Sequence, residues 1–518
     1  MPIATIGNTI DAFLSALNVL DGKFRLPADL LRNCLNEEEA LRRLFATSPT
    51  DPLLADPYVG LIDIFSTLES YTEFDRNFFN LLRTRTHQDF VNPTFVPRES
   101  RLFVNDAPHV GKALVSDIAT FKKNWDAFTY GILDNLNWSG VIAAGGAVQA
   151  CMLPFIDPDL GQNPFTSAHE LDTHYQKHYP TSDIDLFLIG SPMELEAEML
   201  VLQITKAIRK TVRYDIVYVR KANTISIHTL FPYRPLQIIL RSYRSPAEVL
   251  AGFDVDAGCY AFDGETVWTN PRGIAAFIRR GNTIDITRRS PSYESRLAKY
   301  ARRGFEVLLP SLQRTRIDLV AVYNRDLTSF PNGLARLLVL EKMTEDPEYY
   351  RFSPPNHFRF GQPKDDRSIL LRRHPLAQHQ LDASDYDLVW TGVPYGKGWD
   401  AKTIGNLIKK VDAKMNEPER LARDGRSLHR HAVVASEDLD VLLYGTFCQH
   451  CPCPSSFYDV SAEMVTSKYI FGRIEFISAN AGRQLRSGSF NPIDLDDWTD
   501  DAYLPQAQAE GQSSVETA

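Results

Sequence analysis

Cysteine is scarce in this sequence, with 6 Cys among 518 residues. We therefore expect no disulfide framework and an intracellular, reducing compartment, the cytoplasm, with the nucleus as an alternative. The sequence also lacks any run of about 18 uninterrupted apolar residues, so we expect no membrane-spanning helix and no membrane partner. The N-terminal residues lack the basic segment and the apolar stretch of a signal peptide, and we expect none.

An excess of positive charge is likewise missing. The formal net charge is −9, from 56 Lys and Arg against 65 Asp and Glu, so the whole molecule is not a general polyanion binder. Any contact with nucleic acid must use a local basic patch. Hydrophobic residues make up 44% of the chain and aromatic residues 11%, which excludes a chain disordered over its full length.

At roughly 100–200 residues per domain, the length suggests about three domains or two large ones. Residues 1–125 show apolar residues at helical spacing, and we expect a helical region that serves as a cap or contacts a protein partner. Residues 126–325 alternate short β-type runs with helical ones, which predicts an α/β (α+β) domain with a mixed sheet and flanking helices. We expect a mixed region over 326–505 and a disordered tail over 506–518.

Helical and β-type sequence segments within 126–325 indicate this α/β domain. The clearest helical run covers 192–210, and Leu195, Met199, Leu202 and Ile208 are its expected buried stripe. The runs at 214–219 and 224–230 predict a hairpin. The expected strands lie at 141–145, 184–189, 214–219, 224–230, 236–241 and 254–262.

A pair of glycines, Gly145 and Gly146, directly follows the expected strand at 141–145. Paired glycines at a strand-to-helix turn let backbone N–H groups approach a phosphate, and the start of a helix favours anions. A purely structural tight turn is the alternative, because glycine serves any such turn.

Two aspartates, Asp183 and Asp185, open the next apolar strand in the sequence Ser182-Asp-Ile-Asp-Leu. Residues i and i+2 of a strand project to the same side, so the two carboxylates would lie together. A divalent metal relieves their repulsion, and Mg²⁺ prefers few carboxylates together with substrate phosphates. A strand edge that meets solvent is the alternative. Asp254 and Asp256 repeat the i, i+2 pattern in the expected strand at 254–262.

The glycine pair, the paired aspartates on a strand and a further strand acid together resemble the DNA polymerase β-like nucleotidyltransferase superfamily. The stretch from 236 to 305 is also similar to uncharacterised nucleotidyltransferase-like proteins of phages, large viruses and fungi. The resemblance covers about 140–305. It implies that Gly145, Gly146 and Ser182 hold a nucleoside triphosphate (NTP), while Asp183 and Asp185 hold Mg²⁺ or Mn²⁺ for attack on the α-phosphate.

Two features depart from that pattern. The 36 residues between Gly146 and Asp183 exceed the usual spacing and suggest an insertion, which could form a flap. The third acid of the superfamily often stands on a strand like 236–241, where this sequence has Gln237. We therefore assign the third catalytic and metal-binding acid to Asp256, with Asp254 as second choice.

Positive charge is concentrated between residues 272 and 303, with nine basic and two acidic residues. Arg296, Lys299 and Arg303 share one helical face and are candidates to bind triphosphate oxygens or an RNA backbone. Arg241 is a weaker candidate for the same task. A solvated basic face is the alternative.

Two further segments resemble zinc-binding motifs, but less closely than the acid pair resembles an Mg²⁺ site. His169 and His174 are one residue too far apart for the zinc-protease pattern, whereas His174 and His178 have helical spacing but no evident further ligand. Cys448, Cys451 and Cys453 could form a structural zinc site with His429 or His431. Free thiols are the default there, since a second Cys-x-x-Cys is missing.

We interpret the chain as an Mg²⁺-dependent nucleotidyltransferase that moves a nucleotidyl group from an NTP to an RNA end, a protein or a small molecule. The alternative from another class is an inactive relative that acts as a nucleotide sensor or interaction scaffold. The neutral Gln237 favours that alternative.

Overall fold

The computed structural model describes most of the central part of the chain and shorter pieces on either side. The described residues are 6–19, 28–70, 98–104, 113–154, 167–180, 182–190, 194–221, 223–290, 292–323, 333–345, 396–417, 419, 422, 431–436, 438–445, 473–476, 486–488 and 498–503.

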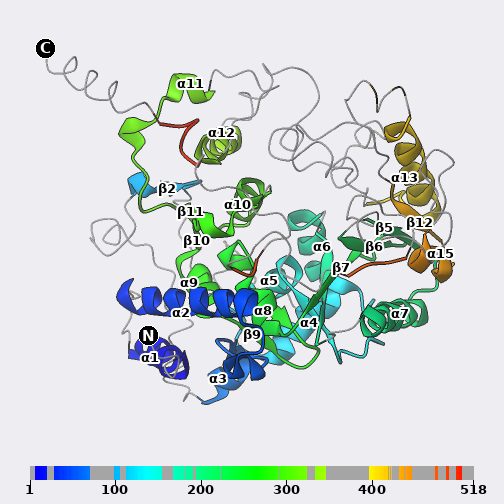
Figure 1. Cartoon of the computed structure of the whole chain (residues 1–518), viewed down its shortest axis with the longest axis horizontal. Coiled ribbons are helices and arrows are strands. Elements are labelled where there is room, and N and C mark those ends of the chain that lie inside the picture. The colour runs from blue at the N-terminus through cyan, green and yellow to red at the C-terminus, as the bar shows by residue number, and fades with distance from the viewer. Residues whose placement is uncertain are drawn as a thin grey trace, which may run out of the picture.

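A mixed sheet with nine strands in the described residues organises the molecule (Figure 1). Every neighbouring pair in it is antiparallel except β4 and β7, which are parallel. In spatial order the strands are β1 (Ile62–Asp63), β9 (Val267–Thr269), β8 (Tyr260–Phe262), β3 (Val141–Ala144), β4 (Ile184–Ile189), β7 (Leu236–Tyr243), β6 (Thr224–His228), β5 (Val217–Arg220) and β12 (Val433–Ala435).

Helices cover both faces of this sheet. One face of β3 and β4 packs in the main core, which also holds side chains of α4 (Ile118–Thr129), α5 (Gly146–Met152) and α7 (Glu194–Thr211). The opposite face contacts α8 (Pro246–Ala251) through Ile142, Phe187 and Ile239. Farther along that face, α13 (Ala401–Met415) covers Val217 and Val219 of β5. The mixed α/β class predicted from the sequence is confirmed.

A second, three-stranded sheet lies beside the main one among the described residues. It consists of β10 (Gly281–Thr283), β11 (Glu306–Leu308) and β2 (Arg101–Leu102). α10 (Tyr293–Ala301) contacts β11 on one side and α12 (Gly333–Glu345) on the other. α12 is buried from Gly333 to Glu341, so it forms an internal helix.

The remaining described elements come from all parts of the chain. They are α1 (Ile6–Val19), α2 (Ala28–Thr47), α3 (Ile64–Ser70), α6 (Ala168–His178), α9 (Pro271–Arg279), α11 (Leu319–Tyr323) and α15 (Leu439–Tyr444), with short 3-10 turns at Pro52–Ala55, Arg98–Ser100, Asp256–Gly258, Ile286–Arg288 and Arg314–Arg316. β1 and β12 come from the regions predicted to flank the central domain, yet both complete its sheet. The domain boundaries at 125 and 325 stay a prediction.

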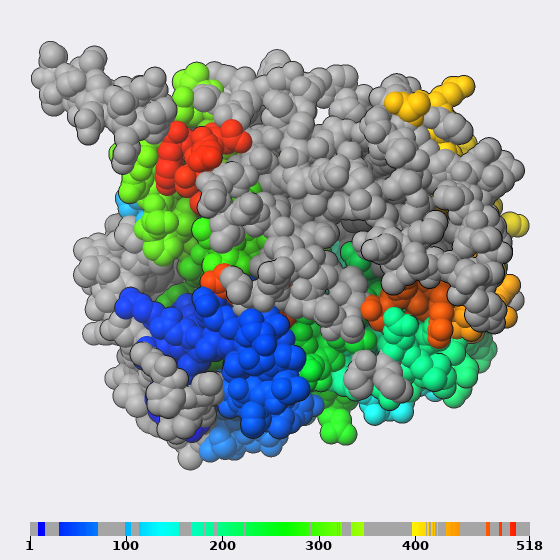
Figure 2. All heavy atoms as spheres, viewed as in Figure 1, coloured from blue at the N-terminus to red at the C-terminus, as the bar shows by residue number. Residues whose placement is uncertain are grey.

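Local sequence explains several of these elements. Ser245 caps α8 and Pro246 opens it, while Ser167 and Glu170 form a reciprocal capping box at the start of α6. The predicted hairpin is confirmed as β5 and β6. Residues 473–476 lie against α7 on the face shown in Figure 2, where Arg473 pairs with Glu198 at 2.8 Å.

Two sequence predictions about elements are wrong in part. In the predicted buried stripe of α7, Ile208 is buried and Leu202 packs against the main core, but Leu195 and Met199 are 59% and 56% exposed. The buried residues of this helix also include Ala197, Val201 and Ile204. The predicted strand at 254–262 is a strand only over Tyr260–Phe262, and a 3-10 turn occupies Asp256–Gly258. No described helix has both the length and the apolar character needed to cross a bilayer.

Candidate functional site

The turn between β3 and α5 requires its first glycine. Gly145 has a φ of +89°, and a Cβ there would lie 3.3 Å from the ring of Phe253 and 4.0 Å from Asp185 Oδ2. Its N–H donates to the carbonyl of Tyr260 at 2.9 Å, so this amide completes the sheet. A Cβ on Gly146 would lie 3.2 Å from the Arg303 guanidinium. The two glycines therefore let an acid strand and a basic helix approach one backbone turn.

The paired aspartates lie side by side at the start of β4, as predicted. Both are half-buried, and the alternate residues Ile184 and Leu186 are buried on the other face of the strand. Burial, with repulsion from Asp183 as the second cause, raises the pKa of Asp185 to about 8. Lys299 and Arg296 oppose that shift because their positive charges face the carboxylate.

The basic face of α10 covers this acid pair. The side chain of Lys299 is exposed, and its charge acts on both Asp183 and Asp185. Arg296, which is 42% exposed, pairs with Asp254 at 3.1 Å. The predicted grouping of the glycine turn, the acid pair and this basic helix in one place is thus what the structure shows.

Arg303 is held inside the site. It donates to Ser182 Oγ at 2.7 Å and to Gln149 Oε1 at 3.3 Å. The guanidinium also lies 4.7 Å from the ring centre of Tyr179 and 5.0 Å from that of Tyr300. Arg303 therefore joins the glycine turn to the start of β4. Two of its partners, Gln149 and Tyr179, carried no sequence signal, because neither belongs to a motif.

Gln237 occupies the strand position next to the acid pair. Because β4 and β7 are parallel, Gln237 is the register partner of Asp185, and on its other side Gln237 pairs with Ser226 of β6. Register partners project to the same face of a sheet, so a neutral amide and a hydroxyl continue the row begun by Asp185.

Asp254 and Asp256 do not join that row. Asp256 bonds to Arg272 at 2.8 Å and to the N–H of Thr283 at 2.7 Å, and Asp254 pairs with Arg296. The predicted i, i+2 geometry fails because the backbone forms a 3-10 turn there rather than a strand. Within the described residues, no group of three or more His, Cys, Asp or Glu side chains could hold a metal.

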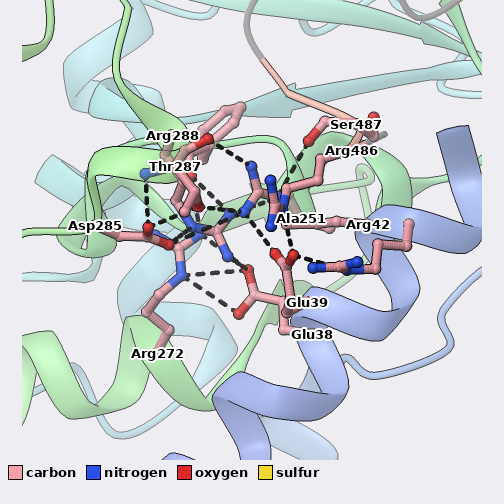
Figure 3. A network of polar contacts seen from close by, with 12 residues as sticks. Glu38, Glu39, Arg42, Ala251, Arg272, Asp285, Thr287, Arg288, Arg486 and Ser487 are labelled. Atoms are coloured by element: carbon pink, nitrogen blue, oxygen red, sulfur yellow. Dashed lines mark hydrogen bonds and ion pairs between the residues drawn. The ribbon is translucent and has the colours of Figure 1, made fainter. Parts of the chain in front are cut away.

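Much of the basic segment 272–303 is internal. Figure 3 shows Arg272 and Arg288 converging on Glu38 of α2, at 3.1 Å and 2.8 Å. Arg289 is fully buried and pairs with Glu294 at 2.9 Å. These arginines are used in packing, so any RNA contact by this segment would fall to its exposed members, such as Arg296, Lys299 and Arg302.

Arg241 lies on β7 but is also committed to an internal pair. It is 2% exposed, donates to Glu248 at 2.8 Å, and bonds to the carbonyl of Gly488. It stands four positions after Gln237, about 13 Å along a strand. It therefore stabilises the packing of α8 and residues 486–488 on the sheet.

The two weaker metal motifs gain no support. The rings of His174 and His178 lie 4.6 Å apart on α6, but they form no larger metal-binding group with other described residues. Burial lowers the pKa of His174 to about 4. Cys448, Cys451, Cys453 and His429 lie outside the described residues, as do residues 155–166 of the predicted flap and the tail 506–518.

The donor set of the acid pair fits a single divalent cation. Asp183 and Asp185 supply hard carboxylate oxygens, and a cation between them would relieve the repulsion that, after burial, raises the pKa of Asp185. These two residues would hold Mg²⁺ together with substrate phosphates.

Comparisons with known proteins relate the chain to viral and anti-defence proteins. The model of the Gad2 family, described as Gabija anti-defense 2 family protein, matches residues 119–280. That range contains the glycine turn, the acid pair and Gln237, and it ends before α10. The chain is also 27% identical over 277 residues to the uncharacterised protein R883 of Acanthamoeba polyphaga mimivirus.

The match to R883 covers 52% of this chain and 54% of the mimivirus protein, so it spans about half of each. No solved structure matches the chain significantly.

Proposed function

We propose that this chain binds an NTP as its Mg²⁺ complex and transfers the nucleotidyl group to an acceptor. The observation that carries the proposal is the approach of the acid pair, the Gly145–Gly146 turn and the basic face of α10 to one another. The superfamily resemblance of the motifs supports it.

In this proposal the acidic residues bind the metal ion and the basic residues bind the phosphates. Asp183 and Asp185 would hold the cation, which when bound supplies positive charge to the α-phosphate region. Lys299 and Arg296 would bind the triphosphate oxygens, because they are the cations that face the pair. Arg303 would hold Ser182 and Gln149 of α5, the helix that follows the glycine turn, through its two hydrogen bonds.

A transfer assay tests the proposal. The protein would be incubated with each α-³²P-labelled NTP, with Mg²⁺ or Mn²⁺, and with a mixed pool of RNA, protein and small-molecule acceptors. We expect transfer by the wild type and its loss in the Asp183→Asn/Asp185→Asn double variant, which keeps side-chain volume but removes both charges. Equal transfer by both proteins would contradict the proposal.

The second candidate is nucleotide binding without transfer, as in a sensor. It is favoured by the neutral Gln237 in register with Asp185. This candidate predicts Mg²⁺-dependent NTP binding that the double variant loses, with no label on any acceptor.

The family match suggests the setting in which the activity operates. We propose that the chain counters host defence of the Gabija type, since the matching family is described by that activity. Plaque counts of a Gabija-sensitive phage on Gabija-bearing bacteria that express the chain would test this. We expect more plaques when the bacteria express the wild type, because the phage is then protected from the defence. The Asp183→Asn/Asp185→Asn variant should not raise the plaque count. An equal rise in plaque count with the wild type and with the variant would show that anti-defence activity does not depend on the acid pair.

A further inference from the structure

On the side away from β3, the two strand positions in register with Asp185 carry uncharged side chains. Asp185 is followed across the sheet by Gln237 and then by Ser226, one on each neighbouring strand. Neighbouring strands are about 4.8 Å apart, so a group bound beside Asp185 would lie within reach of the Gln237 amide. The cations of α10 act on the same pair.

No carboxylate replaces Gln237 in the described residues. Asp254 is paired with Arg296, Asp256 is paired with Arg272, and no third acid, His or Cys groups with Asp183 and Asp185. An amide cannot accept the proton that a hydroxyl acceptor must lose when it attacks phosphorus. A hydroxyl is therefore a poor acceptor for this particular site.

We propose that the acceptor is anionic, a phosphate monoester that is already ionised at neutral pH. Its second pKa is about 6, so no base is needed. A neutral Gln237 also avoids the repulsion that a third carboxylate would exert on such an acceptor. The inference rests on the proposed nucleotidyl transfer and names the acceptor class for the same site.

The bond changes balance without a proton transfer. An acceptor phosphate oxygen forms a new bond to the α-phosphorus, and the bond between that phosphorus and the β-phosphate bridging oxygen breaks. The products are a phosphoanhydride that joins the nucleotide to the acceptor, and inorganic pyrophosphate, which leaves with the bonding electron pair.

The first test uses acceptor binding rather than turnover. Inorganic phosphate would be titrated by calorimetry into the protein saturated with Mg²⁺ and an α,β-methylene NTP, which cannot react. Gln237→Glu is nearly isosteric and should weaken phosphate binding about tenfold or more, because it places a like charge beside the ligand. Gln237→Met, without charge, should stay within about threefold, and Gln313→Glu, an equal charge in an exposed loop, should have no effect.

The second test uses the labelled transfer reaction. Acceptor pools would be treated or not treated with immobilised phosphatase, which is removed before the NTP is added. We expect the wild type to label only untreated pools, in products that resist phosphatase and are cleaved by a phosphoanhydride hydrolase. Gln237→Glu should lose that labelling and gain transfer to hydroxyl acceptors.

The outcomes separate this inference from the proposed function. Wild-type transfer that survives phosphatase treatment would overturn the anionic acceptor while leaving nucleotidyl transfer intact. Equal phosphate affinity in the wild type and Gln237→Glu would overturn the role of Gln237. Mg²⁺-dependent NTP binding with no labelled product from either pool would overturn both the acceptor class and transfer, and would leave nucleotide binding alone.

Discussion

At the scale of the residue, the site contains a strained backbone conformation and a carboxyl group with a shifted pKa. Gly145 has a backbone conformation that other residues rarely adopt, and Asp185 has a pKa raised to about 8. Both features are unfavourable for the free energy of folding, and they lie close together, which is typical of functional sites.

Replacing Gly145 with Ala should destabilise the fold by about 1–3 kcal/mol, because the positive φ disfavours a side chain and the new Cβ would crowd Phe253. Urea denaturation would measure the loss. Gly190→Ala is the matched control, since Gly190 has a φ of +71° but no atom within 4 Å of an added Cβ. A loss at Gly145 no larger than at Gly190 would show that the contact with Phe253 contributes nothing.

The pKa of Asp185 predicts a pH dependence of stability without Mg²⁺. Because burial raises this pKa above its unfolded value, the folded state binds more protons between about pH 4 and pH 8. Stability should therefore fall as pH rises through that window, by at most about 1.4 kcal/mol per pH unit for one proton.

Thermal melts of the wild type and Asp185→Asn across pH 4–8 would measure this contribution. The difference between the two proteins should change steadily with pH and should shrink when Mg²⁺ is added. Parallel pH profiles would contradict the shift.

At the scale of the element, the sequence predicts best where strong local patterns occur. β4 and the β5–β6 hairpin were predictable from apolar runs, and the basic face of α10 was predictable from the helical spacing of its basic residues. The strand expected at 254–262 was not, because tertiary bonds from Asp256 to Arg272 and Thr283 stabilise a turn there. The face of α7 was also unpredictable, since Leu195 and Met199 are exposed while small residues such as Ala197 are buried.

The same limit applies to the site. The acid pair and the glycine turn follow from sequence spacing, whereas the register between Asp185 and Gln237 depends on how β4 and β7 pair. Arg241 and Arg272 could not be distinguished from Lys299 by composition. Arg241 pairs with Glu248 and Arg272 with Glu38, and no pattern in the sequence marks either pair.

The position of α10 predicts the effect of removing its central cation. Lys299→Met should weaken NTP binding about tenfold, because one positive charge that faces both aspartates is lost. Stability should change by less than about 0.5 kcal/mol, since the side chain is exposed. Fluorescence titration with a labelled NTP would measure the affinity. Lys206→Met, an exposed lysine on α7, should leave it unchanged.

At the scale of the whole molecule, distant parts of the chain are joined by buried charges. Glu38 of α2 pairs with Arg272 and Arg288, and Arg42 bonds to the carbonyl of Ser487 (Figure 3). The main core also extends from Phe13 to Ala502. The N-terminal helices therefore pack against the segment that carries α9 and α10.

Glu38→Gln should destabilise the protein by about 3–5 kcal/mol, because it leaves two buried guanidinium groups without their shared carboxylate. Glu69→Gln, at an exposed position on α3, should cost less than about 0.5 kcal/mol. Urea denaturation compares the two. A cost at Glu38 as small as that at Glu69 would show that the network contributes little to stability.

The most direct test of the central claim is calorimetric titration of each NTP into the protein, with and without Mg²⁺. We predict binding that requires Mg²⁺ in the wild type and is lost in Asp183→Asn/Asp185→Asn, while the variant keeps a cooperative thermal transition. Binding of equal affinity in the folded double variant, or no binding of any NTP by the wild type, would contradict the account.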